Sequence, residues 1–218
     1  MIPKRLFDLL CSAVALAVLS PLLGALAVFI WLEDRGPVWY RGQRVGLGGK
    51  PFRIFKFRSM VINAEKIGGP STADGDPRIT RVGRFVRKYK LDEWPQLINV
   101  VIGDMSLVGP RPEVPQYVEY GDPRWKQVLS VRPGITDLAT LVYRDEEEIL
   151  AGAGDPDLCY RSQVLPRKLA LNLEYLGQRT LATDLRLLAL TARYSFVPDG
   201  FRSDEIRTKV MGAARGSQ

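Results

Sequence analysis

An apolar run over residues 9–32 constrains this chain more than any other feature. The run contains no charged residue, and as an α-helix it would be about 36 Å long, enough to reach across the hydrocarbon of a bilayer. A secretory signal is the alternative, since Lys4 and Arg5 supply a basic start and residues 25–27 resemble a cleavage site. The apolar run continues beyond that point. The segment is therefore expected to be embedded in a membrane.

Ser20 and Pro21 interrupt this segment near its middle. Proline lacks a backbone N–H and clashes with the preceding turn, so the helix is expected to bend there. The Ser20 hydroxyl can satisfy a carbonyl that the bend leaves unpaired. Charged residues flank both ends of the segment, and neither end is marked as excluded from the cytoplasm. A kinked spanning helix and a re-entrant hairpin both remain open on these grounds.

The composition predicts one globular domain with an anionic partner. The chain has 218 residues, of which 46% are hydrophobic and 25% charged, and its net charge is +7. Nucleic acid, an anionic membrane surface and a phosphorylated ligand would all be attracted. Nucleic acid is not expected, because aromatic residues do not interleave with the basic ones as stacking platforms. Cys11 and Cys159 lie too far apart in sequence to suggest a disulfide framework or a zinc site, which favours a reducing, cytosolic face.

Patterns after residue 35 predict a small hairpin followed by helices. Residues 37–41 and 52–57 alternate like strands on either side of a glycine-rich turn. Residues 79–89 have the spacing of a basic amphipathic helix, suited to an anionic lipid surface. Two further amphipathic helices are expected after Pro166, and the basic tail over residues 200–218 is expected to be mobile or next to lipid, without a role in a site. The predicted fold class is α+β, mostly helical.

Adjacent carboxylates, Asp92 and Glu93, stand out in a chain that contains no histidine. Without imidazole, Ser or Cys lacks its usual activating base, so a covalent step needs a carboxylate, a metal-activated group or a perturbed Lys. One interpretation makes Asp92 only the N-cap of a helix that begins near Glu93. The other places a phosphate at that helix N-terminus, with Glu93 holding a divalent cation that reduces the repulsion between carboxylate and phosphoryl group. The pair suits phosphoryl transfer.

Basic residues near these carboxylates are the candidate ligands for a phosphate. Lys56 and Arg58 occupy alternate positions of a predicted strand and would share one face, which can meet phosphate or remain a solvated edge. Arg87 is the residue of the basic helix nearest the carboxylates on the side opposite its apolar stripe. These three residues are our candidates for substrate binding.

Several short sequence blocks follow one another along the chain in a specific order. They are the Ser20-Pro21 pair within the apolar segment and residues 56–60, 76–83, 91–97, 103–112 and 132–136. In this order they resemble the bacterial sugar transferase family, also called monotopic phosphoglycosyl transferases. The resemblance covers nearly the whole chain and is closest to the minimal catalytic form of that family.

The resemblance implies a covalent reaction in two steps. Asp92 would attack the sugar-linked phosphorus of a UDP-sugar and release UMP, and undecaprenyl phosphate would then take the phosphosugar. This is the first membrane step in assembling a glycoconjugate such as an exopolysaccharide. Glu93 would carry the Mg²⁺ that the family requires. Lys56, Arg58 and Arg87 match basic positions of its phosphate site.

The nucleotide side of the family's site is matched by Pro110, Arg111 and Pro112. Two prolines with fixed φ would make a rigid turn that presents the Arg111 guanidinium. A turn with a structural role alone is the other interpretation. After Thr136 the chain departs from the commonest family pattern, so the sugar preference is not indicated. The acidic run over residues 145–148 is interpreted as a solvated helix start rather than as a sugar contact.

The resemblance also implies a membrane topology and a division of the chain. Residues 1–35 would form a re-entrant helix, bent at Ser20 and Pro21, that enters and leaves by the cytoplasmic face of the bacterial inner membrane. Residues 36–199 would form the catalytic domain on that face, beside anionic lipids, and residues 200–218 the tail. The oligomeric state stays open, and a homodimer is one option.

Two other functions compete with this hypothesis. In a non-enzymatic membrane adaptor, the basic face would recruit an anionic partner and Asp92 would only cap a helix. In a hydrolase of nucleotide sugars, Asp92 would be a ligand of a metal that activates water, and no covalent adduct would form.

Overall fold

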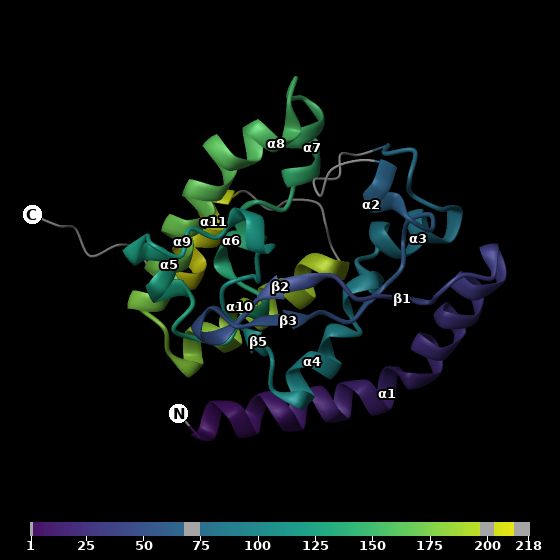
Figure 1. Cartoon of the computed structure of the whole chain (residues 1–218). Coiled ribbons are helices and arrows are strands. Elements are labelled where there is room, and N and C mark those ends of the chain that lie inside the picture. Colours follow the sequence, from purple (N-terminus) through teal and green to yellow (C-terminus); the bar gives the residue numbers. More distant parts are fainter. Residues whose placement is uncertain (1, 68–74, 197–202, 212–218) are drawn as a thin grey trace, which may run out of the picture.

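Helices dominate the computed structural model, which describes residues 2–67, 75–196 and 203–211. The long helix α1 (Ile2–Asp34) runs along one side of the molecule, and the strands form small two-stranded sheets (Figure 1). The expected α+β fold, mostly helical with a long apolar N-terminal helix, is thereby confirmed. Within the described ranges, α1 is the one helix whose length and composition would allow it to cross a membrane.

The other elements are short and follow one another closely along the chain. The strands are β1 (Trp39–Tyr40), β2 (Gln43–Val45), β3 (Pro51–Arg53), β4 (Lys56–Phe57), β5 (Ser106–Val108) and β6 (Gly134–Thr136). The α-helices are α2 (Ala64–Ile67), α3 (Arg81–Lys88), α4 (Gln96–Ile102), α5 (Pro123–Val128), α6 (Leu138–Val142), α7 (Glu146–Ala151), α8 (Pro156–Cys159), α9 (Leu165–Gly177), α10 (Leu181–Phe196) and α11 (Ser203–Met211). The tighter or wider helical turns are η1 (Leu47–Gly49), η2 (Leu91–Glu93), η3 (Pro115–Tyr117) and η4 (Tyr160–Val164).

Helix α1 changes direction partway along its length, and Pro21 lies inside it (Figure 1). In a regular helix the carbonyl of Ala17 would accept the N–H of the residue four positions later, and proline has none. The Ser20 hydroxyl donates to that same carbonyl at 2.8 Å. The Ser20-Pro21 pair therefore bends the helix while keeping the Ala17 carbonyl satisfied.

The first half of α1 is fastened to the rest of the molecule by charged side chains. The Arg5 guanidinium donates to the carbonyl oxygens of Val100 at 2.6 Å and Val101 at 3.1 Å, in the last turn of α4. A cation is favourable there because the last carbonyls of a helix are unpaired and carry partial negative charge. Asp8 is buried and accepts a hydrogen bond of 2.8 Å from the Ser106 hydroxyl in β5.

The second half of α1 is held mainly by apolar packing against the same body. Leu26 and Ile30 are buried together with Phe57 of β4 and Val86 of α3. At the end of the helix, the Glu33 carboxylate accepts the backbone N–H of Arg81 at 2.7 Å, at the first residue of α3. A carboxylate at this position compensates the positive end of the helix dipole. Both halves of the bent helix thus rest on one compact domain.

The expected hairpin is present as two short antiparallel ladders. Strand β1 pairs with β4, and β2 pairs with β3. The turn between β2 and β3 passes through Gly48 and Gly49, whose φ angles of 67° and 78° lie in the left-handed region that favours glycine. The glycine-rich stretch is therefore a turn, as its sequence predicts.

A parallel pair, β5 and β6, was not foreseen, and it positions the segment around Arg111. Ser106 pairs with Gly134, and Val108 pairs with Thr136. The backbones approach so closely that a Cβ on Gly134 would lie 2.1 Å from the backbone nitrogen of Gly109, so only glycine fits. This contact fixes where the chain leaves β5.

The helices after residue 164 cover the core. Helices α9 and α10 are the two amphipathic helices expected after Pro166. The expectation of a mobile or lipid-adjacent tail is wrong for residues 203–211, which form α11. Ile206 and Val210 of this helix are buried in the main core beside Leu138 of α6 and Tyr175 of α9. The rest of the tail lies outside the described residues.

Candidate active site

The position of Lys56 is fixed by a buried amide. The Asn99 side chain in α4 accepts the backbone N–H of Phe55 at 2.7 Å and donates to the backbone carbonyl of Arg53 at 3.0 Å. These two bonds tie the connection between β3 and β4 to α4, because a buried amide is stable only when its polar atoms are paired. Lys56 follows directly and is held close to the carboxylates that precede α4.

Asp92 lies in the tight turn η2, almost completely buried with 2% of its surface exposed. One oxygen, Oδ2, lies 2.9 Å from the Lys56 ammonium. The other, Oδ1, is buried with no hydrogen-bond partner within the described part of the chain. The alternative of an N-cap is not what the structure shows, since α4 begins at Gln96 and Asp92 caps no helix there. Asp92 is a buried carboxylate with one oxygen still able to form a bond.

Glu93 stands between two cations. Its Oε1 lies 3.2 Å from the Lys56 ammonium, and its Oε2 accepts a hydrogen bond of 3.0 Å from the Arg111 guanidinium, which also contacts Oε1. Burial alone would raise the pKa of Glu93, but attraction to Arg111 and Lys56 outweighs it and holds the pKa well below its usual range. Burial opposes the charge on Lys56 as well, yet Asp92 and Glu93 raise its pKa above the ordinary value. Glu93 and Lys56 therefore both stay charged at neutral pH.

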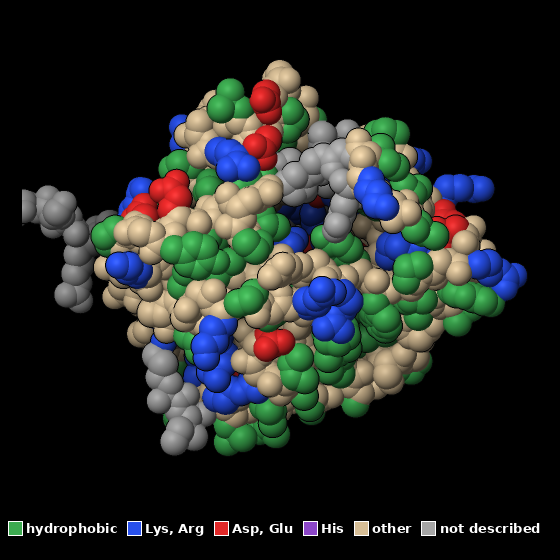
Figure 2. Space-filling model, viewed as in Figure 1, with side chains coloured by type: hydrophobic (Ala, Val, Ile, Leu, Met, Phe, Trp, Pro, Cys, Tyr) green, Lys and Arg blue, Asp and Glu red, His purple; other side chains and the backbone are tan. Residues whose placement is uncertain are grey.

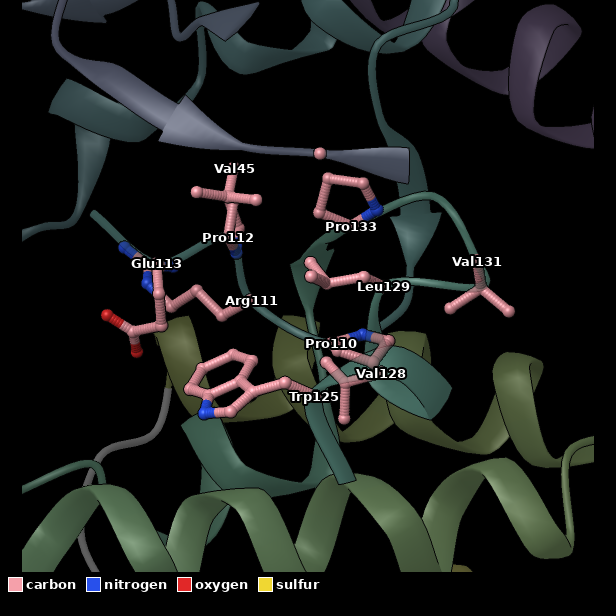
Figure 3. Close-up of a pocket in the computed structure, with 11 residues that line it drawn as sticks. Val45, Pro110, Arg111, Pro112, Glu113, Trp125, Val128, Leu129, Val131 and Pro133 are labelled. Atoms are coloured by element: carbon pink, nitrogen blue, oxygen red, sulfur yellow. The ribbon is translucent and has the colours of Figure 1, made fainter. Parts of the chain in front are cut away.

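Arg111 is placed by the loop that follows β5. Its backbone N–H donates to Asp137 Oδ2 at 2.9 Å, and the carbonyl of the preceding Pro110 accepts the N–H of Gly134 at 2.9 Å. Figure 3 shows Arg111 between Pro110 and Pro112 at a small pocket that Trp125 also lines. The two prolines and the two hydrogen bonds fix the loop, and the guanidinium reaches back to Glu93. A rigid turn that presents Arg111 is therefore present.

Arg58 lies apart from this group. It is buried, and its guanidinium donates to both carboxylate oxygens of Asp34 at 2.5 Å and to the carbonyl of Pro37 at 2.6 Å. A guanidinium held by a carboxylate in this two-pronged geometry is firmly oriented. Arg58 thus fastens the end of α1 to the hairpin, and its described contacts do not include Asp92 or Glu93.

Arg87 also pairs elsewhere, with the acidic run that the sequence marks as a solvated helix start. Its guanidinium donates to Glu147 at 2.7 Å, joining α3 to α7. The neighbouring Glu146 lies 3.0 Å from the ammonium of the buried Lys168. The acidic run is therefore engaged by cations rather than simply solvated. Sequence patterns gave no signal for Asn99 or Lys168, because neither lies in one of the motifs or in a group of residues of like chemistry that would mark a site.

The oxygen atoms near Asp92 are of the kind that Mg²⁺ prefers. This ion takes oxygen ligands and usually binds one or two carboxylates, with waters and phosphates completing its shell. No group of three or more Cys, Asp or Glu side chains within the described ranges forms a metal site by itself. Asp92 and Glu93 nevertheless offer adjacent carboxylates and one unpaired oxygen. They fit an ion that is shared with ligand phosphates, provided that Glu93 gives up one of its present cations.

Lys56, Asp92, Glu93 and Arg111 form a compact centre suited to phosphorylated ligands, in a chain whose first helix is long and apolar enough to cross a membrane. Comparison with known proteins makes this specific. Residues 1–197 match the model of the family described as bacterial sugar transferase, and the chain belongs to that family.

The names of individual relatives describe them as transferases that act on undecaprenyl phosphate. The chain is 48% identical over 143 residues to the UDP-N-acetylgalactosamine-undecaprenyl-phosphate N-acetylgalactosaminephosphotransferase of Aeromonas hydrophila, covering 64% of this chain and 34% of that protein. It is 47% identical over 116 residues to a Bacillus subtilis protein described as an undecaprenyl-phosphate N-acetylgalactosaminyl 1-phosphate transferase, covering 53% and 65%. A UDP-glucose:undecaprenyl-phosphate glucose-1-phosphate transferase of Caulobacter vibrioides is 37% identical over 194 residues, covering 86% and 67%. The chain thus spans between a third and two thirds of the length of these relatives.

Proposed function

We propose that this protein transfers a sugar-1-phosphate from a UDP-sugar to undecaprenyl phosphate and releases UMP. One observation carries the proposal: the buried Asp92 carboxylate pairs with the Lys56 ammonium through one oxygen and keeps the other unpaired, next to Glu93 and Arg111. A carboxylate in this state needs no base to become a nucleophile. Family membership and the names of the relatives support the choice of substrates.

In the first step, Asp92 Oδ1 attacks the phosphorus that bears the sugar. The new aspartyl O–P bond forms while the bond from this phosphorus to the bridging oxygen breaks, and UMP leaves with that oxygen and its electron pair. Arg111 is placed to meet the negative charge that develops on the departing phosphate. Lys56 holds Oδ2 and thereby orients the carboxylate.

In the second step, a phosphate oxygen of undecaprenyl phosphate attacks the same phosphorus. The aspartyl O–P bond breaks, and the Asp92 carboxylate is regenerated with its electron pair. The acceptor therefore receives the phosphosugar without any net proton transfer to the protein. The soluble donor and the lipid acceptor can therefore react at the same carboxylate one after the other, because each brings a phosphate to it.

Magnesium belongs to the proposal, with Glu93 as its principal ligand and Asp92 beside it. When bound, Mg²⁺ would offset the negative charges of the donor's two phosphates. Glu93 can accept it by exchanging the Lys56 or Arg111 contact, since both cations can turn to the phosphates. Arg58 and Arg87 were also expected at the phosphate site. Arg58 is held by Asp34, away from Asp92. Arg87 is held by Glu147, and we propose that it contacts substrate only if Glu147 is displaced.

The proposed location is the cytoplasmic face of the bacterial inner membrane, with α1 as a re-entrant helix. Support comes from its two ends: Arg5 and Asp8 near the start and Glu33 near the end all contact the same domain. A helix whose ends are held by one domain returns to the side from which it entered. Hydrophobic side chains gather along α1 at the lower edge of Figure 2, beside several Lys and Arg side chains. This arrangement suits contact with acyl chains and anionic headgroups.

The decisive experiment is intact-protein mass spectrometry in detergent with Mg²⁺ and a panel of UDP-sugars, without a lipid acceptor. UDP-N-acetylgalactosamine heads the panel because the names of two relatives specify that sugar. Wild type should gain the mass of one phosphosugar and release UMP, and Asp92→Asn should do neither. Glu93→Gln, the matched change in the same turn, should still form the adduct, more slowly and with a higher Mg²⁺ requirement.

The competing functions give different results in the same experiment. UMP release without an adduct would support a hydrolase that uses activated water. Binding of UDP-sugar without UMP release, for every sugar tested, would favour a non-enzymatic adaptor. Loss of a preformed adduct on addition of undecaprenyl phosphate, with appearance of the lipid-linked sugar, would establish the second step.

A further inference from the structure

A second buried group of charges lies beside Arg111, and the proposed reaction does not use it. Lys168 in α9 is buried, and its ammonium lies 3.0 Å from Glu146 Oε2, 3.6 Å from Glu113 Oε1 and 3.3 Å from the hydroxyl of Tyr160. The Tyr160 hydroxyl donates to Glu113 Oε1 at 2.6 Å. One ammonium therefore serves two carboxylates at once.

Both carboxylates belong to the surroundings of Arg111: Glu113 lines the same pocket (Figure 3), and Glu146 acts on the charge of Arg111. Glu113 is two residues further along the same fixed loop, and its backbone carbonyl accepts the N–H of Val45 at 2.9 Å. The Glu113 and Glu146 side chains are 14% and 27% exposed, so water only partly screens their charge. An unpaired carboxylate in such a place is costly, and it draws the nearest available cation.

The electrostatics show that these groups act on one another. Glu93 is the largest cause of the raised pKa of Arg111, and Asp137 and Glu146 add to it. Burial lowers the pKa of Lys168, but Glu113 and Glu146 outweigh burial and keep it above its ordinary value. Arg111 therefore lies within reach of the field of Glu146, while Lys168 stays charged and neutralises that carboxylate.

We propose that Lys168 is a positioning residue for Arg111: by holding Glu113 and Glu146, it leaves the Arg111 guanidinium on Glu93 and free to meet donor phosphate. Without Lys168, Glu113 would keep the Tyr160 hydroxyl as its donor, but Glu146 would lose its cation and would draw the Arg111 guanidinium away from Asp92 and Glu93. The role of Lys168 in phosphosugar transfer rests on the proposed function, whereas its effect on the orientation of Arg111 does not.

The first arm of the test measures kcat/KM for donor turnover in Lys168→Met. Displacement of a positioned group by about 1 Å can cost up to about 100-fold in rate, so we expect a loss of about 10- to 100-fold. Arg167→Met is the matched control, because it removes the same charge from the neighbouring, exposed position of α9. The control should stay within about threefold of wild type, the size expected for an exposed charge.

The second arm adds Glu146→Gln to Lys168→Met. If Lys168 works by neutralising a competitor, removing the competitor should restore most of the lost kcat/KM. The double variant also removes Glu146 together with its cation, and Glu113 keeps the Tyr160 hydroxyl as its donor, so this variant should fold even if Lys168→Met does not. A well-folded double variant that remains as slow as Lys168→Met would overturn the proposal, as would a Lys168→Met enzyme with wild-type kcat/KM.

The third arm is an experimental structure of the same variants, which needs no activity. The Arg111 guanidinium should leave Glu93 for Glu146 or Glu113 in Lys168→Met and return to Glu93 in the double variant. Arg111 remaining on Glu93 in Lys168→Met would refute the inference directly. If wild type itself transfers no phosphosugar, the proposed function fails while this arm still decides the role of Lys168.

Discussion

Two regions of this molecule bury charged side chains, and they differ in one respect. At the start of α1, the Lys4 ammonium lies 2.7 Å from Asp184, and the Asp8 carboxylate accepts from the Ser106 hydroxyl. Around Asp92 the same residue types gather, but Asp92 Oδ1 has no partner in the described part of the chain. At the start of α1, even Asp184 Oδ2, which has no hydrogen bond, faces the Lys4 ammonium, whereas Lys56 faces one oxygen of Asp92 and leaves the other free.

The largest effect is expected at the unmatched carboxylate. Asp92→Asn should reduce adduct formation at least about 1,000-fold, because removal of a nucleophile leaves only binding and electrostatic effects. The free energy of unfolding should change by less than about 1 kcal/mol, since Lys56 keeps Glu93 as a partner. Single-turnover kinetics and denaturant titration would measure the two quantities. A large loss of stability would place Asp92 with the structural charges and break the comparison.

The matched charges should show the opposite behaviour. Asp8→Ala removes a buried partner of Lys4, Ser106 and the backbone N–H of Leu107, so we expect a loss of about 3 kcal/mol in the free energy of unfolding. The rate of adduct formation per folded molecule should remain within about threefold of wild type, as for a group remote from the chemistry. Thermal unfolding in nanodiscs and active-site titration would separate these effects.

A smaller effect is expected from the hydroxyl at the bend of α1. Ser20→Ala leaves the Ala17 carbonyl without its donor and should cost about 1 kcal/mol, the usual value for one hydrogen bond. Ser12→Ala is the matched control in the same helix, since the Ser12 hydroxyl is buried without a partner in the described residues. This control should leave stability unchanged or raise it. Equal losses from both changes would show that the hydroxyl at the bend has no special role.

The smallest effect is expected from pH near neutrality. The pKa of Glu93 is depressed from 4.5, so the stability that its charge gives the folded protein is present above that pH and is lost on acidification. The pKa of Lys56 is raised from 10.5, so the stability that its charge gives is present below that pH and is lost in stronger alkali. The chain has no histidine. Adduct formation should therefore vary less than about twofold between about pH 6 and pH 9. A sharp transition inside this window would point to a titrating group outside this cluster.

Sequence reasoning predicted the site best where its residues lie within short motifs. Lys56, Asp92, Glu93 and Arg111 were candidates, and the structure brings them together. Arg58 was expected beside them because it alternates with Lys56 on a strand. Its partner Asp34 lies 24 residues away at the end of a bent helix. Such a pairing depends on the path of the chain, which alternation does not reveal.

The fold was predictable to the extent that its elements are long or strongly periodic. The apolar helix, the hairpin and the helices α9 and α10 have such patterns. Strands β5 and β6 have three residues each, too few for a period to be recognised. Helix α11 did leave a signal, because Ile206 and Val210 are four positions apart, the spacing of one helical face. The basic composition of the tail concealed it.

The attachment of α1 at both ends has a consequence for the bilayer around the protein. A spanning helix can adapt to thicker or thinner membranes by changing its tilt. The Arg5 and Glu33 contacts fix the separation of the two ends of α1, so on the proposed topology its bend reaches one set depth. The height of Asp92 above the hydrocarbon is then a property of the protein, and reconstitution into lipids of different acyl length should leave the rate of transfer nearly constant.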